Sequence, residues 1–414
     1  MTVLEKSHRI CGRVITFEKG GYLVDGCATS ISTAYVDYIA LLKEVGLSNR
    51  LVEASNIFGV VRDGVAHYVD GLAPIRSFLG TGLMSWPEKL RFVRGAMKLK
   101  KYSEDAVLAD PGRSVKHDHL SIDQVARDCF GDALIDTLMD PIMRVVTFGD
   151  VRDTTAVELF TGIISASGRY VNVIGGLETL PRELAKHVEV KPGPPGRHVE
   201  KGADGRVEVS WDEGSVKQAQ TVDACIITCT FPDAAAMCPQ LAAAAPRLAQ
   251  QKAYAESVVV HLGYTVETKS RPAAIALPRK EFPNNPAIFL DHYKAPDRAP
   301  KGHSLFTLYY CPEAVAKVKA MSEDNVIADA RAIIERYFPE VAGHLDMSNI
   351  HFAPYGSHLA PPGHFGMVQE LYDNHAGSEP IQIGGDYLSL PSQETAVGQG
   401  NRAARRIIDG VSRA

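Results

Sequence analysis

The stretch Val3-Leu4-Glu5, followed by Arg9-Ile10-Cys11-Gly12-Arg13, decides the fold class of this chain of 414 residues. Val3 to Glu5 predicts a short strand that ends in an acidic residue, and in a nucleotide-binding βαβ unit an acid at this place accepts hydrogen bonds from the ribose hydroxyls. Gly12 lets the backbone pass close to a ligand, and an arginine can bind a pyrophosphate through two parallel hydrogen bonds. A glutamate before a basic turn is more often part of a solvated loop, so this stretch alone does not establish a nucleotide site.

A second glycine turn lies near the other end of the chain, at Ile383-Gly384-Gly385-Asp386. It follows a predicted strand and precedes a helix that we expect from Thr395 to Ile408. Free backbone N–H groups and the positive end of the helix dipole favour a phosphate or an electron-rich ring at such a place. An ordinary strand–turn–helix that closes a sheet is the alternative.

Between these two ends, predicted strands alternate with predicted helices. Early strands at 14–17 and 22–24 flank the hairpin signal Lys19-Gly20-Gly21, and 105–174 is expected to be mainly helical. Further strands are predicted at 188–191, 198–201, 207–211, 224–229, 257–264, 287–291 and 304–310, with helices at 33–45, 177–187 and 323–337 and a proline-rich loop at 354–363. This alternation predicts an α/β architecture.

Composition excludes several classes of protein. With 44 Lys and Arg against 49 Asp and Glu, the net charge of −5 argues against a partner nucleic acid. A hydrophobic content of 45 % argues against a disordered chain, and no apolar run is long enough to span a membrane. Residues 1–13 lack the apolar core of a signal peptide. Seven scattered cysteines predict neither a disulfide framework nor a metal site, so we expect a cytoplasmic protein.

Taken together and in this order, the motifs resemble the flavin-dependent amine oxidase superfamily, which includes protoporphyrinogen oxidases and phytoene desaturases. The resemblance covers nearly the whole chain. Its further markers are Val24-Asp25-Gly26-Cys27-Ala28, Gly175-Gly176-Leu177-Glu178-Thr179-Leu180 and the strand Ala224 to Cys229 leading to Pro232. The resemblance implies a Rossmann-like FAD-binding domain interleaved with a substrate domain of a mixed sheet and helices. We expect the FAD-binding domain at 1–60, 175–235 and 376–414, and the substrate domain at 61–174 and 236–375.

The resemblance also implies the residues that bind the cofactor. These are Glu5 at the adenosine ribose; Arg9, Gly12 and Arg13 along the pyrophosphate and flavin; Val199 at the adenine; Gly385 and Asp386 at the ribityl chain and phosphate; and Thr395 and Ala396 at the pyrimidine edge of the flavin. Two of the matching positions depart from the family pattern, because Cys11 and Thr395 stand where relatives have glycine. A threonine adds a side chain where the backbone of relatives approaches the cofactor.

One family element is absent from the sequence. Relatives begin with a strand, a Gly-x-Gly-x-x-Gly turn and a helix, about 30 residues that would precede Val3. Gly80-Thr81-Gly82 continues to Ser85, and Gly398-Gln399-Gly400 falls inside the predicted final helix, so neither supplies the turn. We therefore expect an N-terminally incomplete FAD-binding domain whose strands have open edges. Three explanations stay open: an internal start or fragment of a longer flavoenzyme, a partner chain that completes the nucleotide-binding sheet, or a descendant that has lost flavin.

The expected function is that of an FAD-dependent oxidoreductase that removes hydride from an apolar or amine-bearing small molecule. The alternative is a flavin-less isomerase, lyase or binding subunit; a homo-oligomer is a further expectation. Flavin chemistry of this kind needs no acid or base, so no catalytic residue is assigned. The polar rings to inspect in the substrate domain are those of Tyr309, Tyr310, Tyr355, His358 and His364.

The helix predicted over 87–101 is basic and partly amphipathic. Contact with a membrane surface is one interpretation of this composition. A solvated helix is the preferred interpretation, because Phe92, Val93 and Leu99 do not form one stripe on the helix.

Overall fold

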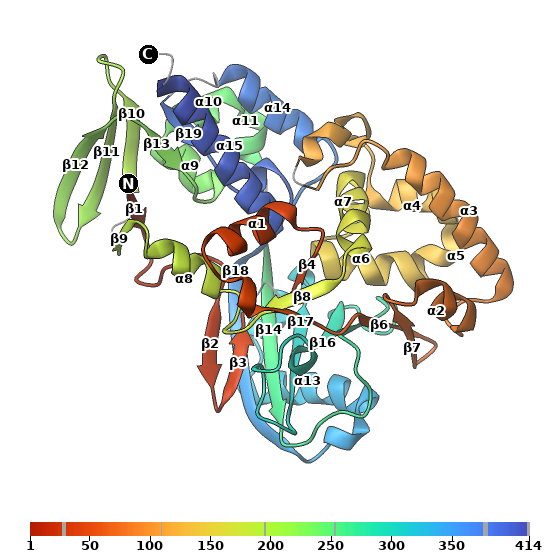
Figure 1. Ribbon diagram of the computed structural model, residues 1–414. Helices are drawn as coiled ribbons and strands as arrows, with labels where there is room; N and C mark the ends of the chain where they lie inside the picture. Colours follow the sequence, from red (N-terminus) through yellow and green to blue (C-terminus); the bar gives the residue numbers. More distant parts are fainter. Residues whose placement is uncertain (27–29, 109, 194–195, 252–253, 376–379, 412–414) are drawn as a thin grey trace.

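The computed structural model describes residues 1–26, 30–108, 110–193, 196–251, 254–375 and 380–411. Short parallel strand pairs and an antiparallel sheet lie toward one end of the molecule, a long mixed sheet toward the other, and a group of helices to one side (Figure 1). This is the α/β fold that the sequence predicts, with a dinucleotide-binding part interleaved with a mixed sheet.

Two separate pairs of parallel strands carry the segments expected to bind the cofactor. β1 (Thr2–Glu5) pairs with β9 (Glu189–Pro192), and β13 (Cys225–Ile227) pairs with β19 (Ile381–Ile383). Among the described strands, β1 and β13 each pair along one edge only. The carboxyl end of β1 lies near the start of helix α9 (Phe231–Met237), where Lys6 Nζ is 2.9 Å from an oxygen of Asp233. Within the part of the chain that the structure describes, these two parallel pairs therefore form separate sheets.

The largest sheet has seven strands. In spatial order they are β18 (Leu345–His358), β14 (Tyr254–Tyr264), β17 (Ser304–Tyr310), β16 (Ala287–Leu290), β15 (Ala274–Ala276), β6 (Ile57–Arg62) and β7 (Val65–Asp70). Helix α13 (Glu323–Tyr337) covers this sheet and contributes Val326, Ala330 and Ile334 to its core. The bounds of α13 are those that the sequence predicts.

The prediction of a loop over residues 354–363 is partly wrong, because strand β18 extends through His358. Pro354 lies inside this strand, and a proline is tolerated there because β18 is at the edge of the sheet, where one side of the strand donates no ladder hydrogen bonds. The β6–β7 hairpin was not predicted. The predicted hairpin near the N-terminus is confirmed as β2 (Thr16–Lys19) and β3 (Tyr22–Asp25).

The helical group lies on the right in Figure 1. It contains α2 (Pro74–Gly80), α3 (Trp86–Tyr102), α4 (Ile122–Phe130), α5 (Asp132–Leu134), α6 (Asp140–Thr147) and α7 (Ala156–Ser167). Leu99, Ile122, Phe130 and Phe160 from three of these helices (α3, α4 and α7) belong to one buried cluster, which explains why this polar segment folds into helices around a common core. No described helix is long and apolar enough to cross a membrane.

The remaining elements complete the fold, and the helix Val315–Lys319 among them packs in the core of the large sheet. They are β4 (Ile31–Ser32), α1 (Val36–Glu44), β5 (Leu51–Glu53), β8 (Tyr170–Val173), α8 (Thr179–Ala185), β10 (Gly196–Lys201), β11 (Val207–Glu213), β12 (Val216–Val222), α10 (Pro239–Ala244), α11 (Pro246–Gln250), α12 (Val315–Lys319), α14 (His364–Asn374) and α15 (Gln393–Val411). We propose that the domains divide as the sequence predicts, although β6 begins at Ile57, before the expected boundary at residue 60.

A glycine in β14 allows the N-terminal hairpin to lie against the large sheet. A Cβ atom added at Gly263 would lie 2.6 Å from the ring of Tyr22. Tyr22 is the first residue of β3, and its side chain is fully buried. We expect Gly263→Ala to lower the free energy of unfolding by about 1–3 kcal/mol, because the aromatic ring cannot yield easily. Urea unfolding followed by circular dichroism measures this. Gly400→Ala, in open space within α15, is the control and should be neutral or stabilising; equal losses in both variants would contradict the explanation.

Candidate cofactor and active site

The centre of the candidate site is the ion pair between Arg13 and Asp386. A guanidinium nitrogen of Arg13 lies 2.6 Å from a carboxylate oxygen of Asp386, 373 residues away in sequence. The hydroxyl of Tyr254 donates to the other carboxylate oxygen at 3.0 Å, and the Arg13 guanidinium lies 5.1 Å from the centre of the Tyr254 ring. The two motifs that the sequence singled out at opposite ends of the chain therefore meet in space.

The loop from Arg9 to Arg13 has the backbone of a glycine turn even where glycine is absent. Cys11 and Gly12 both have left-handed φ angles, of 83° and 56°. A non-glycine residue is strained in this region, so Cys11 adopts the conformation that relatives achieve with glycine. Burial raises the pKa of the Cys11 thiol, which keeps the thiol protonated.

Arg9 holds this loop from within. Its guanidinium bonds to the carbonyl oxygen of Gly12 and donates to that of Val14 at 3.1 Å. It also forms an ion pair with Glu178, whose carboxylate is buried and pairs in addition with Arg182. In this arrangement Arg9 shapes the loop, and Glu178 is a supporting residue whose role the sequence did not reveal.

The turn at Gly385 requires glycine. Its φ of 156° with ψ of 162° is unfavourable for other residues, and an added Cβ would lie 2.6 Å from the ring of Tyr387. Asp386 follows at once and is almost completely buried. The backbone of the turn thus aims the Asp386 carboxylate at Arg13.

Thr395 at the start of α15 turns its side chain inward. Its hydroxyl bonds to the carbonyl oxygens of Leu390 and Ser392, and the side chain is fully buried. The next residue, Ala396, is exposed. The side chain of Thr395 therefore does not occupy space outside the helix, although it replaces a glycine of the family pattern.

Two other predicted cofactor residues lie apart from the Arg13–Asp386 pair. Glu5 ends β1, and its carboxylate accepts a hydrogen bond from the backbone N–H of Ser7 at 2.8 Å. Val199 lies in β10 and is buried in a hydrophobic cluster with Ile227 and Phe231. Their assigned contacts with ribose and adenine remain predictions.

A second buried ion pair supports the N-terminal hairpin. Asp25 lies 2.9 Å from Arg298 and accepts hydrogen bonds from the Thr16 hydroxyl at 2.6 Å and the Leu177 N–H at 3.2 Å. Burial raises the pKa of Asp25, against the effect of Arg298. These contacts join the Val24-Asp25-Gly26 motif to the Gly175-Gly176-Leu177 motif.

Next to Asp386 lies a group of rings that we name the imidazole–tyrosine cluster: Tyr254, Tyr355, His358 and His364. The Tyr254 ring is 5.6 Å from that of Tyr355 and 5.5 Å from that of His358, and the two imidazoles are 4.9 Å apart, measured between ring centres. Three of the polar rings flagged in the sequence therefore lie together. Tyr254 was missed, because nothing in its sequence context distinguishes it from any other residue at the start of a strand.

The imidazoles of the cluster are neutral and incompletely paired. Burial lowers the pKa of His358 to about 3 and that of His364 well below its usual value. Among the described residues, neither ring nitrogen of His358 and only one of His364 has a hydrogen-bond partner. Buried polar atoms without partners each cost about 1–3 kcal/mol, so these nitrogens mark a place where a ligand or water is expected to bind.

Tyr309 and Tyr310 lie elsewhere, in β17. The Tyr309 ring packs against Phe148 and Phe289, and the Tyr310 hydroxyl donates to Asp329 at 2.7 Å. Burial raises the pKa of Tyr310 far above its ordinary value. Both therefore support the sheet.

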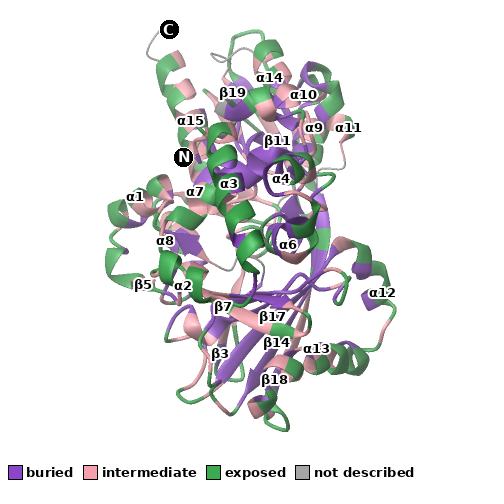
Figure 2. Ribbon diagram, turned by 90° about the vertical axis from the view of Figure 1, so that its right-hand side faces the viewer, coloured by how far each residue is buried: buried purple, intermediate pink, exposed green. Residues whose placement is uncertain are grey.

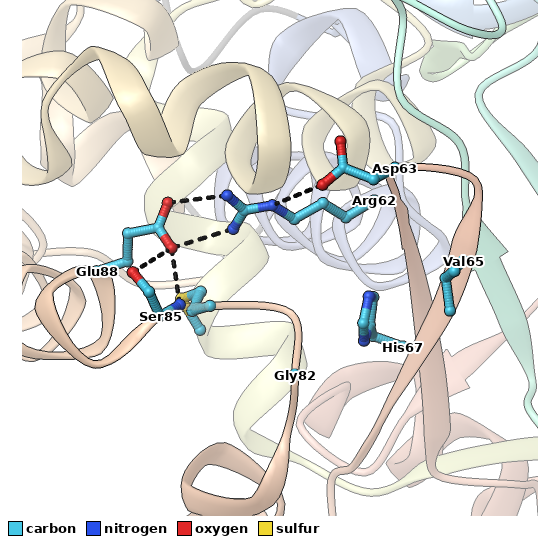
Figure 3. Close-up of a pocket in the computed structure, with 8 residues that line it drawn as sticks. Arg62, Asp63, Val65, His67, Gly82, Ser85 and Glu88 are labelled. Atoms are coloured by element: carbon cyan, nitrogen blue, oxygen red, sulfur yellow. Dashed lines mark hydrogen bonds and ion pairs between the residues drawn. The ribbon is translucent and has the colours of Figure 1, made fainter.

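A separate open pocket of about 420 Å³ lies between β6, β7 and the start of α3 (Figure 3). Arg62 crosses it and binds both carboxylate oxygens of Glu88 at 3.1 Å, and Glu88 accepts from the N–H of Ser85 at 2.7 Å to form a capping box. The hydrogen bonds from Arg62 lower the pKa of Glu88 to about 2. These contacts begin α3, and we assign no chemistry to this pocket.

Comparison with known proteins identifies the family. The sequence pattern of flavin containing amine oxidoreductases matches residues 1–408. The chain belongs to the flavin-containing amine oxidoreductase family. It is accordingly an oxidoreductase of the amine oxidase and porphyrinogen oxidase type. The resemblance inferred from the sequence motifs is confirmed.

Individual members of this family agree with the assignment. The chain is 23 % identical over 368 residues to coproporphyrinogen III oxidase of Bacillus subtilis, covering 79 % of this chain and 74 % of the relative. Its fold is similar to that of cyclohexylamine oxidase from Brevibacterium oxydans, with a TM-score of 0.78 at 13 % identity over 99 % of this chain and 93 % of the other. An oxidoreductase from Methanosarcina mazei has a TM-score of 0.71 at 12 % identity, covering 98 % and 94 %.

The residues present fit a flavin around the Gly385-Asp386 turn. Three observations support this fit: the glycine-only backbone at Gly385, the left-handed turn at Cys11 and Gly12, and the unpartnered nitrogens of His358. The His358 nitrogens offer bonding capacity near the Arg13–Asp386 pair, and the two turns bring the backbone to it in conformations that glycine favours.

The contribution of the Arg62–Glu88 ion pair to the start of α3 can be tested by measuring stability at different pH values. Because the folded-state pKa of Glu88 lies below its unfolded value of about 4.5, its stabilisation is complete above that pH and is lost as the pH falls toward 2. We expect Glu88→Gln to lower the free energy of unfolding by about 1–2 kcal/mol at pH 7 and much less at pH 2–3. Urea unfolding at a series of pH values measures both.

The control is Glu323→Gln, which alters a first-turn glutamate of α13 for which no arginine partner occurs among the described residues. It should change stability by only a few tenths of a kcal/mol. A loss for Glu88→Gln that stays constant from pH 7 to pH 2 would show that the pair does not act through its charge.

Proposed function

We propose that this flavoprotein family member uses FAD and removes hydride from an apolar or amine-bearing small molecule. The observation that carries the proposal is the Arg13–Asp386 pair, which joins the loop after the acidic strand to the Gly–Asp turn before the last helix. In nucleotide-binding α/β folds, ligands lie at the carboxyl ends of the parallel strands, and both segments follow such strands. Glu5, at the end of β1, is available at the same edge for the ribose that distinguishes FAD from FMN.

Several residues of this chain would hold FAD. We assign Glu5 and Val199 to the adenosine portion, Arg9, Gly12 and Arg13 to the pyrophosphate side, and Gly385, Asp386, Thr395 and Ala396 to the flavin side. Bound flavin would supply the acceptor for a hydride, which carries two electrons and one proton. The Thr395 hydroxyl is bonded inward and the Thr395 N–H donates to the Ser392 hydroxyl at 3.1 Å, so Thr395 would act by holding the first turn of α15 in place.

The chain's own contribution to the chemistry is a dry, uncharged wall beside the flavin-binding turn. His358 and His364 are buried and neutral at physiological pH, and the pKa of Tyr387 is raised by burial, so its phenol stays protonated. Such a wall excludes water and orients a substrate without placing a fixed charge against it. It favours an apolar or neutral amine-bearing substrate.

The names of the relatives support the same substrate class. One relative is a coproporphyrinogen oxidase and another a cyclohexylamine oxidase. Coproporphyrinogen and cyclohexylamine both carry nitrogen next to carbon atoms that can lose hydrogen. We propose a substrate of this kind for the present chain.

We further propose a reducing compartment such as the cytoplasm, since the six described cysteines are all free thiols. A partner chain or second copy that completes the nucleotide-binding sheet stays a proposal as well. The unpaired edges of β1 and β13 are where its strand would pair.

The cofactor proposal is tested by the visible spectrum of the purified protein. We expect flavin absorption bands near one equivalent per chain, and chromatography of the released cofactor should identify FAD. Colourless protein should bind added FAD more tightly than FMN, because only FAD carries the adenosine portion assigned to Glu5 and Val199. Protein that binds neither would favour the flavin-less alternative, and FMN alone would overturn the assignment of FAD.

Substrates are distinguished by anaerobic mixing. Loss of the flavin bands on addition of cyclohexylamine, or of coproporphyrinogen, would identify the class that delivers hydride. Bands that persist with both compounds would contradict the proposed substrate class while leaving the cofactor assignment intact.

The Gly385 turn gives a specific variant. Gly385→Ala places a methyl group against Tyr387 and twists the turn, so we expect bound flavin to fall at least tenfold while the folded structure is retained. Gly80→Ala, at the end of α2 with open space around it, is the control and should keep its flavin. Equal flavin content in both variants would show that the turn does not hold the cofactor.

A further inference from the structure

Helix α3 exposes a continuous apolar stripe. Trp86, Leu90, Val93 and Met97 follow one another at intervals of four, three and four residues, so they lie on one face of the helix. All four are between 44 % and 68 % exposed. Figure 2 shows α3 facing the viewer with most of its surface exposed.

Helix α2 and the turn before it widen this stripe into a surface. Leu72, Ile75 and Leu79 are exposed by half or more, with Ile75 at 77 %. The rings of Phe78 in α2 and Phe92 in α3 lie 5.5 Å apart, so the two helices are neighbours. A shallow groove of about 330 Å³ between them is lined by Phe78, Phe92, Val93, Ala96, Met97 and Lys100. Seven large exposed apolar side chains from adjacent segments are unusual for a surface that faces only water.

The same segment is strongly basic. Residues 72–101 contain seven basic residues (Arg76, Lys89, Arg91, Arg94, Lys98, Lys100 and Lys101) and one acid, Glu88, although the chain as a whole carries a net charge of −5. At 3.6 residues per turn, Lys100 lies on one side of the α3 stripe, and Arg94 and Lys101 lie on the other. Basic side chains therefore border the apolar stripe on both sides.

Of Phe92, Val93 and Leu99, the three residues considered in the sequence, only Val93 belongs to this stripe. Leu99 is buried and Phe92 packs against the core of the helical group, whereas Trp86, Leu90 and Met97 point outward. Phe92, Val93 and Leu99 do not form one stripe because Phe92 and Leu99 face the core of the helical group, whereas Val93 faces outward.

We propose that the α2–α3 face, defined as the exposed apolar residues 72–97 with their flanking basic side chains, docks on a lipid bilayer that carries anionic headgroups. Apolar side chains enter the boundary between headgroups and acyl chains, and lysine and arginine extend outward to lipid phosphates. Trp86 at the start of the stripe is a residue type that favours this boundary. The docking is independent of the proposed cofactor and substrate.

The charges decide between a bilayer and a second copy of the chain. In a symmetric dimer the same surface meets itself, so the basic residues of the two copies would face each other and repel. An anionic bilayer instead attracts the basic side chains that border the stripe, Arg94, Lys100 and Lys101. The occupant that fits both the apolar stripe and its basic borders is therefore the membrane surface.

The intact wild-type protein carries its own probe. It has two tryptophans; Trp211 is 7 % exposed and Trp86 is 68 % exposed, so a fluorescence change on binding reports Trp86. We expect a blue shift and quenching by brominated lipid with phosphatidylcholine vesicles that contain phosphatidylglycerol, weakened by salt. Trp86→Phe should lose the spectral change and still float with the vesicles, although its binding should be weaker by a few fold because a phenylalanine favours the boundary less. No shift and no flotation with anionic vesicles would overturn the proposal.

Variants separate the apolar and the charged contributions. Leu90→Glu with Met97→Glu should lower vesicle binding at least tenfold, and each of Arg94→Gln, Lys100→Gln and Lys101→Gln about fivefold. Val216→Glu, on the exposed strand β12, is the matched control and should bind as the wild type does. Light scattering tests the competing occupant. A dimer that dissociates on Leu90→Glu with Met97→Glu, or equal binding to neutral and anionic vesicles, would overturn the proposal.

Discussion

The carboxylate of Asp386 is almost fully buried, and a buried carboxylate persists only where positive charge and hydrogen bonds compensate for its lost hydration. Arg13 supplies the charge and Tyr254 the hydrogen bond. Through these two contacts the N-terminal loop, the first residue of β14 and the turn after β19 hold one another in place. The positions of α15 and of the imidazole–tyrosine cluster depend on this junction, since both adjoin it in the chain or in space.

Much of this junction could be predicted from the sequence. Arg13, Gly385 and Asp386 belong to short motifs. In each motif the residue type is needed for a backbone conformation or a charge, so its role can be inferred from the neighbouring sequence. Tyr254 could not be predicted, because its role arises from the pairing of β14 with β18 and not from its neighbours in sequence. The same holds for Glu178, whose buried carboxylate is explained only by the two arginines that reach it.

The limits of periodicity are clearest in α3. Its sequence alternates inward and outward apolar residues around the whole helix, so a search for one stripe fails until burial separates Leu99 from Met97. Pro354 illustrates the opposite case, because proline predicts a loop unless the strand is known to be at a sheet edge. In both, the missing information was the position of an element relative to its neighbours.

The divided parallel sheet has a consequence for how the chain folds. The contact between Thr2 of β1 and Glu189 of β9 spans 187 residues of sequence, and the contact between Arg13 and Asp386 spans 373. The hairpins β2–β3 and β6–β7, by contrast, form between adjacent segments. Contacts between distant residues form slowly, because long loops must close before any bond is gained. The cofactor-binding half is therefore expected to assemble last, only after synthesis has reached β19 and α15. During translation the exposed strand edges of that half stay unpaired until their partners are synthesised, which prolongs the time in which the nascent chain can aggregate.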